Sequence, residues 1–204
     1  MNLEAALLNV VLFWLLTTPH EFAHAWVATR LGDDTPRLEG RVTLNPMAHV
    51  DWLGTVFLPI VSSLLGAGFI GWGRAVNTNP YALKGGLNGL AVVAMAGPAM
   101  NIVLALGAAA LAVALSGGAP DVAQLAVFAT RLSLYLAIFN MLPVPPLDGS
   151  KLLLAARVPT AVYNELARFG FILLMVAMSI TPLGVWMSAW SWDTTRRMVA
   201  LFGG

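Results

Sequence analysis

The sequence of 204 residues contains no cysteine. Disulfide frameworks and metal sites built on thiolates are therefore excluded, and any metal site must use histidine and carboxylate side chains. Charged residues are also scarce, at 10% of the chain, and the net charge is only +1. Because the lysines and arginines are spread along the connecting segments, no basic patch has the density that a nucleic-acid surface needs. We expect no nucleic-acid partner.

What the chain has in abundance is apolar side chain. Hydrophobic residues make up 58% of it and the mean hydropathy is +0.78, more than a soluble domain of this length can enclose. The sequence predicts an all-α polytopic protein of the lipid bilayer, with residues 1–204 as a single membrane-embedded domain. About four to six transmembrane helices are expected, because a crossing takes about 20 apolar residues. Four such runs are clear: 3–31, 87–116, 122–142 and 164–180.

Two further segments have less regular patterns. Residues 51–72 are apolar but interrupted by proline, serine and glycine, which favours either a kinked span or a re-entrant hairpin. Residues 37–46 alternate apolar and polar side chains with the two-residue period of a short strand. We therefore expect a small β-element at the membrane face.

Basic residues set the expected orientation, because short cytoplasmic loops carry an excess of lysine and arginine. Such residues occur in the segments 31–50, 73–86 and 143–163 and are missing from the turn at 117–121. The sequence thus predicts a multi-pass protein of a bacterial or archaeal cell membrane, with its amino terminus outside and those three segments in the cytoplasm. If both ends of 51–72 meet cytoplasmic segments, that run enters and leaves on one side, as a hairpin does.

The stretch "TTPHEFAHAWVATR" places ionisable groups at the end of an apolar helix. On a helix, His20 and His24 lie one turn apart, so both imidazoles can reach one tetrahedral ion. Glu21 is rotated by about 100° and can serve as general base at the fourth, water-filled position. Pro19 can bend the helix and make room for water and substrate. Because charged groups inside a membrane cost about 2.5–3.5 kcal/mol each on insertion scales, we expect these residues to have a chemical task.

A catalytic zinc usually has three protein ligands, so a third must come from elsewhere in the chain. The candidates are His49 and Asp51 in "NPMAHVDWLGT" and Asp148 in "FNMLPVPPLDGSKLL". The prolines of the second stretch prevent a continued helix, so an extended segment can bring Asp148 to the ion from a different helix. An ordinary turn would also explain Asp148 next to Gly149.

Five motifs occur in order along the chain: "HEFAH", "GRVTLNPMAHVDWLGT", "GWGRAVNTNP", "AGPAMN" and "NMLPVPPLDG". Together they resemble the site-2 proteases, a family of intramembrane zinc metalloproteases. The resemblance implies that His20, His24 and Asp148 bind one zinc ion per chain and that Glu21 activates the water. We expect a short form, without the PDZ or CBS domain that some members carry.

Three further polar residues are candidates for substrate binding or transition-state support, and each has a structural alternative. The resemblance implies that Asn140 helps to hold an extended substrate, but the residue could also cap a helix. His49 could donate to the oxyanion, line the entrance, or hydrogen-bond the predicted strand. Asn101 could support the reaction or bridge two helices.

The sequence therefore predicts a metalloprotease that hydrolyses peptide bonds in or near transmembrane segments of membrane proteins, as in regulated intramembrane proteolysis, with its active site toward the cytoplasm. An unwound substrate segment could pair with the strand expected at 37–46. One rival is a metal-binding membrane transporter, in which intramembrane ionisable residues mark an ion path. Another is a non-catalytic membrane scaffold, although a scaffold needs no glutamate beside a zinc site.

Overall fold

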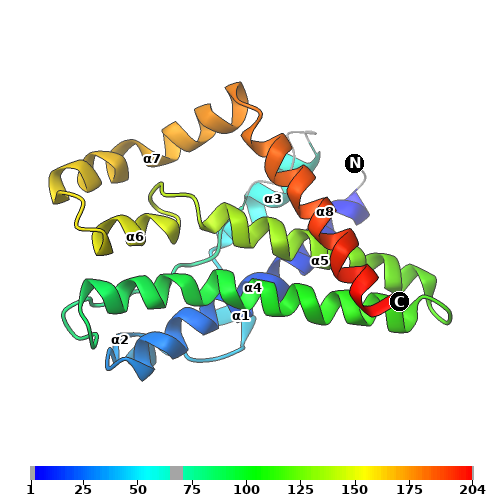
Figure 1. The fold of residues 1–204 in the computed structure, drawn as a ribbon, viewed down its shortest axis with the longest axis horizontal. Coiled ribbons are helices and arrows are strands. Elements are labelled where there is room, and N and C mark those ends of the chain that lie inside the picture. The colour runs from blue at the N-terminus through cyan, green and yellow to red at the C-terminus, as the bar shows by residue number, and fades with distance from the viewer. Residues whose placement is uncertain (1–2, 65–70, 204) are drawn as a thin grey trace.

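The structure is a computed structural model that describes residues 3–64 and 71–203. Its helices, shown in Figure 1, are α1 (Leu3–Arg30), α2 (Thr35–Leu38), α3 (Leu58–Leu64), α4 (Leu87–Leu115), α5 (Pro120–Asn140), α6 (Gly149–Ala155), α7 (Thr160–Ile180) and α8 (Leu183–Gly203). A 3-10 turn at Pro46–Ala48 and a π-helical turn at Trp52–Phe57 lie between α2 and α3.

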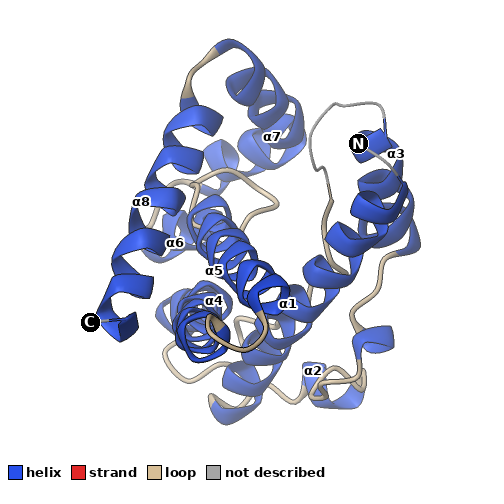
Figure 2. Ribbon diagram, turned by 90° about the vertical axis from the view of Figure 1, so that its right-hand side faces the viewer, coloured by secondary structure: helices blue, strands red, loops and turns tan. Residues whose placement is uncertain are grey.

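The centre of the molecule is the antiparallel pair α4 and α5, with α1 packed against α4 (Figures 1 and 2). The buried side chains between these helices are mostly small, including Ala105 and Ala109 of α4 and Ala126 and Ala137 of α5. Small residues let helix backbones approach closely, which is how helices associate in lipid, where burying apolar surface between helices brings no advantage over contact with lipid tails.

The four clearest sequence expectations for helices are confirmed. The runs at 3–31, 87–116, 122–142 and 164–180 correspond to α1, α4, α5 and α7, with boundaries that differ by a few residues. Within the described residues, three helices are long and apolar enough to cross a membrane, namely α4, α5 and α7. The expected count of about four to six spans therefore stays a prediction.

The strand expected at 37–46 is wrong. The described chain has α2 over Thr35–Leu38 and irregular backbone from 39 to 45, and no strand forms within residues 3–64 and 71–203. A proline in the first turn starts α2, and the Asp33 carboxylate accepts a hydrogen bond of 3.0 Å from the backbone nitrogen of Thr35. Gly40 then takes a positive φ of 68°, which is outside the extended region. The proline and the glycine therefore determine the local structure, and the alternation of apolar and polar side chains over ten residues does not.

In the segment 51–72, the π-helical turn and α3 pack against α1. Residues 65–70, which follow α3, lie outside the described residues. Beyond them, the Trp72 backbone nitrogen donates to the Gly54 carbonyl at 2.9 Å, and the Thr55 hydroxyl donates to the Trp72 carbonyl at 2.9 Å. Both ends therefore lie side by side, which favours the hairpin over the kinked span.

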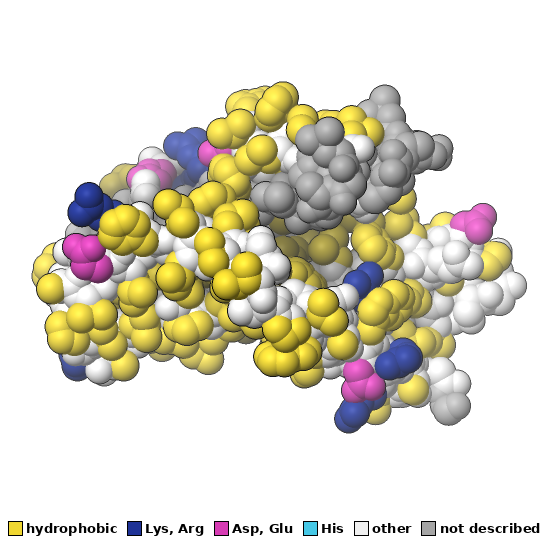
Figure 3. Space-filling model, turned by 90° about the horizontal axis from the view of Figure 1, so that it is seen from above, with side chains coloured by type: hydrophobic (Ala, Val, Ile, Leu, Met, Phe, Trp, Pro, Cys, Tyr) yellow, Lys and Arg dark blue, Asp and Glu magenta, His cyan; other side chains and the backbone are white. Residues whose placement is uncertain are grey.

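Helix α7 stands apart from the α4–α5 pair, on the side away from α2 (Figures 1 and 2). It contacts the segment after α5 through Gly170, where an added Cβ would collide with the Pro145 carbonyl. Helix α8 then runs back along α5, and the Arg131 guanidinium donates to the Ser188 hydroxyl at 2.8 Å. Hydrophobic side chains cover most of the face seen in Figure 3, and most charged side chains on it lie toward its ends.

Candidate metal centre and active site

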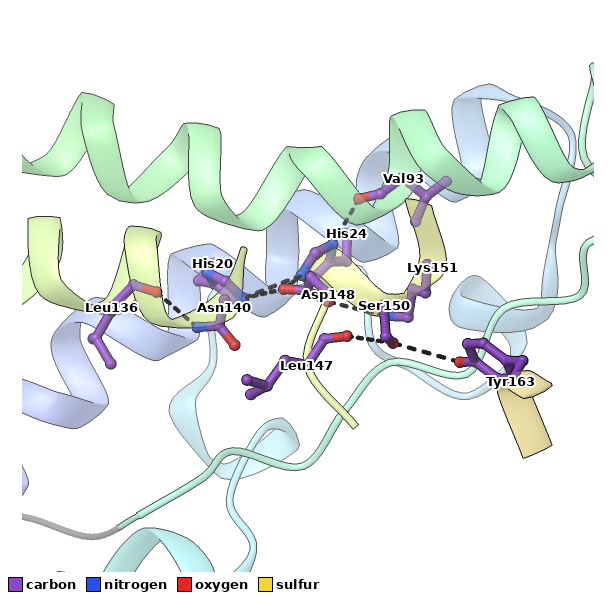
Figure 4. Close-up of polar contacts among 10 residues, drawn as sticks. All are labelled: His20, His24, Val93, Leu136, Asn140, Leu147, Asp148, Ser150, Lys151 and Tyr163. Atoms are coloured by element: carbon purple, nitrogen blue, oxygen red, sulfur yellow. Dashed lines mark hydrogen bonds and ion pairs between the residues drawn. The ribbon is translucent and has the colours of Figure 1, made fainter. Parts of the chain in front are cut away.

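The two histidines of "HEFAH" lie where the helical spacing predicts. His20 and His24 are each 4% exposed, and their Nε2 atoms are 3.1 Å apart on one face of α1. Figure 4 shows both rings directed at the segment that follows α5. The helix thus presents two imidazole nitrogens at one buried point.

Asp148 approaches this point from the other side. Its Oδ2 atom is 3.2 Å from His20 Nε2 and 3.0 Å from His24 Nε2 (Figure 4). Helix α6 begins immediately after it, at Gly149, where a Cβ would collide with the Met141 carbonyl. Glycine is needed there to fold the segment back sharply enough to bring Asp148 to the histidines.

Of the three candidates for a third ligand, Asp148 is the one that joins the histidines. Among the described residues, His20, His24 and Asp148 are the group whose ligand atoms lie close enough to hold one metal ion. His49 and Asp51 lie outside this group. The ordinary-turn alternative for Asp148 does not account for its contacts with both rings.

The donor set fits a cation. His24 Nδ1 lies 2.7 Å from the Val93 carbonyl, and in a neutral ring this contact makes Nδ1 the donor and leaves a lone pair on Nε2. That lone pair then faces a carboxylate oxygen at 3.0 Å, an arrangement that is repulsive without a positive charge between them. The spacings of 3.0–3.2 Å approach the roughly 3.3 Å between ligand atoms around tetrahedral zinc. Two imidazoles and one carboxylate therefore match a zinc site with a fourth position open.

Lys151 secures the other oxygen of Asp148, a contact that the sequence analysis missed. Its Nζ donates to Oδ1 at 2.9 Å, so that Oδ2 alone faces the histidines. The available signal was an Asp and a Lys three residues apart in "LDGSK", a spacing at which two side chains meet if the segment is helical.

Gly97 of "AGPAMN" was also missed. It lies on α4 against the histidines, and an added Cβ would collide with His24 Nε2 and lie 2.5 Å from His20 Nε2. Any side chain here would intrude on the two candidate metal-ligating nitrogens. The sequence shows a glycine inside an apolar helix, but only the crossing of α1 and α4 shows why a larger residue does not fit.

Glu21 is buried, with 9% of its surface exposed, and no described residue forms a hydrogen bond or ion pair with its carboxylate. Its Oε1 atom would lie 3.6 Å from a Cβ placed on Gly73. A carboxylate that is free of partners can accept a proton, so the placement is compatible with the predicted role of general base.

The backbone beside Glu21 has no regular secondary structure from Trp72 to Arg74. Trp72 uses both of its backbone groups in hydrogen bonds to Gly54 and Thr55. The Arg74 nitrogen donates to the His49 carbonyl at 2.9 Å, and its carbonyl accepts from the Arg41 guanidinium. Between them, the N–H and C=O of Gly73 have no partner among the described residues. One edge of this short segment is therefore free, next to Glu21.

His49 is placed as a structural residue. It is 3% exposed, and its Nε2 donates to the Thr43 carbonyl at 2.8 Å. Burial lowers the pKa of its imidazole, the bond to Thr43 opposes this, and Arg41 lowers the pKa further. A neutral ring that donates through Nε2 has no hydrogen on Nδ1, so His49 is a poor candidate for an oxyanion donor. The alternative of a bond to the 37–46 segment is the one the contacts favour, although that segment is not a strand.

The two asparagines differ. Asn140 ends α5, and its Nδ2 donates to the Leu136 carbonyl at 3.0 Å, as a residue that closes a helix end does (Figure 4). Asn101 is 1% exposed, and neither atom of its amide has a hydrogen-bond partner among the described residues. The amide of Asn101 therefore does not bridge two helices directly. The expected roles of both residues toward substrate stay predictions.

Comparison with known proteins decides the family. The chain is 37% identical over 180 residues to the Bacillus subtilis protein named "Putative zinc metalloprotease YwhC", a match that covers 82% of this chain and 77% of that protein. The chain belongs to peptidase family M50, the site-2 protease family. The resemblance seen in the sequence is thereby confirmed. The model of "Peptidase family M50" itself matches residues 117–177, which include Asp148.

Other M50 relatives carry similar names. The chain is 30% identical over 183 residues to "Putative zinc metalloprotease Rip2" of Mycolicibacterium smegmatis, covering 87% of this chain and 69% of the relative. For the Rip2 protein of Mycobacterium tuberculosis (strain H37Rv) the identity is 33% over 143 residues, covering 69% and 54%. No solved structure matches the chain. Family membership and these names support a metalloprotease role.

Proposed function

We propose that this M50 protein is a zinc metalloendopeptidase that hydrolyses peptide bonds in or near transmembrane segments of membrane proteins, as in regulated intramembrane proteolysis. One observation carries the proposal: the ligand atoms of His20, His24 and Asp148 lie 3.0–3.2 Å apart in a buried site, and the Glu21 carboxylate beside them has no partner among the residues that the structure describes. One zinc ion per chain would occupy this site.

Zinc, when bound, polarises the scissile carbonyl and makes its water easier to deprotonate. Glu21 takes the proton from that water and returns it to the leaving amine, which are the tasks of a general base and general acid. Lys151 keeps Asp148 oriented, because it holds Oδ1 while Oδ2 faces the Nε2 atoms of His20 and His24. Gly97 keeps the space beside the histidine nitrogens clear.

The substrate segment must unwind before cleavage, because carbonyls within a helix are hydrogen-bonded and shielded. An extended substrate can pair with the N–H and C=O of Gly73, which have no partner in the described part of the chain, by the mode in which a peptide adds a strand to an exposed edge. This replaces the strand at 37–46 as the pairing partner. It would bring the scissile carbonyl to the side of the site where Glu21 lies.

For the membrane arrangement, we propose that α1 crosses together with α4, α5 and α7 and that residues 51–72 form a re-entrant hairpin. The amino terminus then lies outside, and the active site opens toward the cytoplasm. The chain lacks cysteine, so Gly118→Cys in the exposed turn after α4 provides a single thiol for labelling in intact cells or inverted vesicles. Labelling only from the outside is expected, and labelling only from the cytoplasmic side would invert the topology.

The decisive experiment incubates the detergent-purified protein with a model single-span substrate, with and without a zinc chelator. We expect cleavage that the chelator abolishes and added zinc restores. Glu21→Gln is the matched variant, since it keeps size and hydrogen bonding but cannot take up the proton. It should retain zinc while cleavage falls by about 10²-fold or more, as is typical for loss of a general base. Cleavage that survives the chelator would contradict the proposal, and loss of zinc in Glu21→Gln would make Glu21 structural.

A further inference from the structure

The two histidines of the metal site differ at the nitrogen that faces away from the ion. His24 Nδ1 donates to the Val93 carbonyl at 2.7 Å. His20 Nδ1 is fully buried and has no hydrogen-bond partner among the described residues. Metal-bound histidines almost always donate their second ring N–H to an acceptor, which fixes the tautomer and the ring orientation. His20 therefore requires an acceptor that the neighbouring backbone does not supply.

The Asn101 side chain, in turn, offers an acceptor for which the described residues supply no donor. Its side chain is 1% exposed, and both its Nδ2 and Oδ1 atoms are buried without partners in the described part of the chain. The backbone carbonyl of Asn101 does accept a bond, from the Ser133 hydroxyl at 2.7 Å, so the helix itself is well packed at this level. An unpaired amide inside a protein is costly, and an ordered water is a common remedy.

The geometry of α4 brings these two requirements together. A Cβ placed on Gly97 would lie 2.5 Å from His20 Nε2 and 2.6 Å from His20 Cε1, the ring atom between Nε2 and Nδ1. Asn101 follows Gly97 by one helical turn on the same face of α4, and helical side chains lean toward the amino terminus, so the Asn101 amide leans toward Gly97. The unpaired donor of His20 and the unpaired acceptor of Asn101 thus occupy one region between α1 and α4.

We propose that Asn101 is a positioning residue for the zinc ligand His20, acting through one buried water. The water accepts the hydrogen of His20 Nδ1 and donates a hydrogen to Asn101 Oδ1. Buried waters of this kind make about three hydrogen bonds to groups that would otherwise be unsatisfied. The bond keeps the hydrogen of His20 on Nδ1 and the lone pair of Nε2 free for the metal. This inference rests on the zinc site of the proposed function.

The test measures zinc affinity by competition with a chelating dye. Asn101→Leu matches the shape of asparagine but has no hydrogen-bonding atoms, and it should bind zinc about 10–100-fold more weakly, the usual cost of removing such a partner. Asn101→Asp keeps an oxygen acceptor and should stay much closer to wild type. The visible spectrum of the cobalt-loaded protein should change in Asn101→Leu, because His20 is then free to turn.

Ser133→Ala is the matched control. It removes the 2.7 Å bond to the Asn101 backbone carbonyl and so disturbs the packing of α4 on α5, but it leaves the amide in place. Its zinc affinity and cobalt spectrum should equal those of wild type. Equal weakening in Ser133→Ala and Asn101→Leu would overturn the inference, because helix packing would then explain the effect.

Further outcomes separate this inference from the proposed function. Wild-type protein that binds zinc and cleaves substrate, together with unchanged affinity in Asn101→Leu, would overturn the role of Asn101 alone. Wild-type protein that binds no zinc would overturn both. Should Asn101→Leu fail to fold, Asn101→Val and Asn101→Thr give the same comparison with smaller side chains, and tighter zinc binding by the threonine variant is expected.

Discussion

Helices α4 and α7 bury their surfaces in different ways. Helix α4 packs against α1 and α5 through small residues, so Ala105 and Ala109 are fully buried. Helix α7 instead leaves large side chains uncovered, with Ile172 61% and Ile180 77% exposed. In a membrane these side chains face lipid tails, which are as apolar as they are.

This contrast separates the helices that must hold the metal ligands in place from a helix that carries none of them. A metal site tolerates only small displacements of its ligands, so the elements that carry them must pack closely. Helices α1 and α4 and the end of α5 meet this requirement through alanine and glycine. Helix α7 contacts the segment around Asp148 only lightly, through Gly170 at Pro145 and through the Tyr163 hydroxyl, 3.5 Å from Ser150. Substitutions in the tightly packed part should therefore affect zinc far more than substitutions in α7.

The largest effect is expected for Gly97→Val. Its side chain would collide with His24 Nε2 and crowd His20 Nε2, so zinc binding should be lost. Gly107→Ala on the same helix is the control, because nothing lies within 4 Å of a Cβ there. Metal analysis of the purified proteins checks both. Full zinc content in Gly97→Val would show that the site is looser than the packing of α1 on α4 indicates.

Lys151→Met should have an intermediate effect. The methionine keeps most of the side-chain length but frees Asp148 Oδ1, so zinc affinity should fall by about tenfold, at the low end for loss of a group that orients a ligand. Lys84→Met removes the only other lysine, which is exposed on a different loop. Zinc competition should distinguish the two variants. An equal loss in both would mean that net charge matters and the contact with Asp148 does not.

Gly170→Leu tests the contact between the two regions. The new side chain would collide with the Pro145 carbonyl and push α7 away, which should lower stability by about 1–3 kcal/mol, as overpacking does. Thermal unfolding in detergent measures this. Zinc should still bind, because the histidines are on α1 and are not displaced. Complete loss of zinc would show that α7 holds the Asp148 segment more firmly than its few contacts suggest.

The smallest effect is expected for Ile172→Ala on the exposed face of α7. Stability in detergent should change by no more than about 0.5 kcal/mol, as is usual for surface substitutions, and zinc affinity should not change. A large loss of stability would mean that this face is covered by protein and not by lipid or detergent.

The helices were predictable because a membrane restricts the backbone conformations that a chain can adopt. Every backbone group must be satisfied inside the bilayer, so a long apolar run is almost always a helix, and four such runs became α1, α4, α5 and α7. The strand at 37–46 failed because an alternation over ten residues is weak evidence. The proline at the start of α2 and the positive φ of Gly40 decide the local structure instead.

The site was predictable where its signal is local or the family resemblance supplied it. The helical repeat places His20 and His24 together, and the prolines after α5 made Asp148 a reasonable third ligand. Gly97 and the Val93 carbonyl contribute through the crossing of α1 and α4, which no short stretch of sequence encodes. Long-range packing therefore explains most of what was missed.

The two ends of the segment 51–72 are joined by two hydrogen bonds: the Trp72 nitrogen donates to the Gly54 carbonyl, and the Thr55 hydroxyl donates to the Trp72 carbonyl. Whatever lies between these points, the chain emerges at Gly73 in the same position beside Glu21. The entropy of closing a flexible loop grows slowly, by only about 0.6 kcal/mol for each doubling of its length. A change in the length of the chain between α3 and Trp72 should thus cost little free energy, while the backbone next to Glu21 keeps its register.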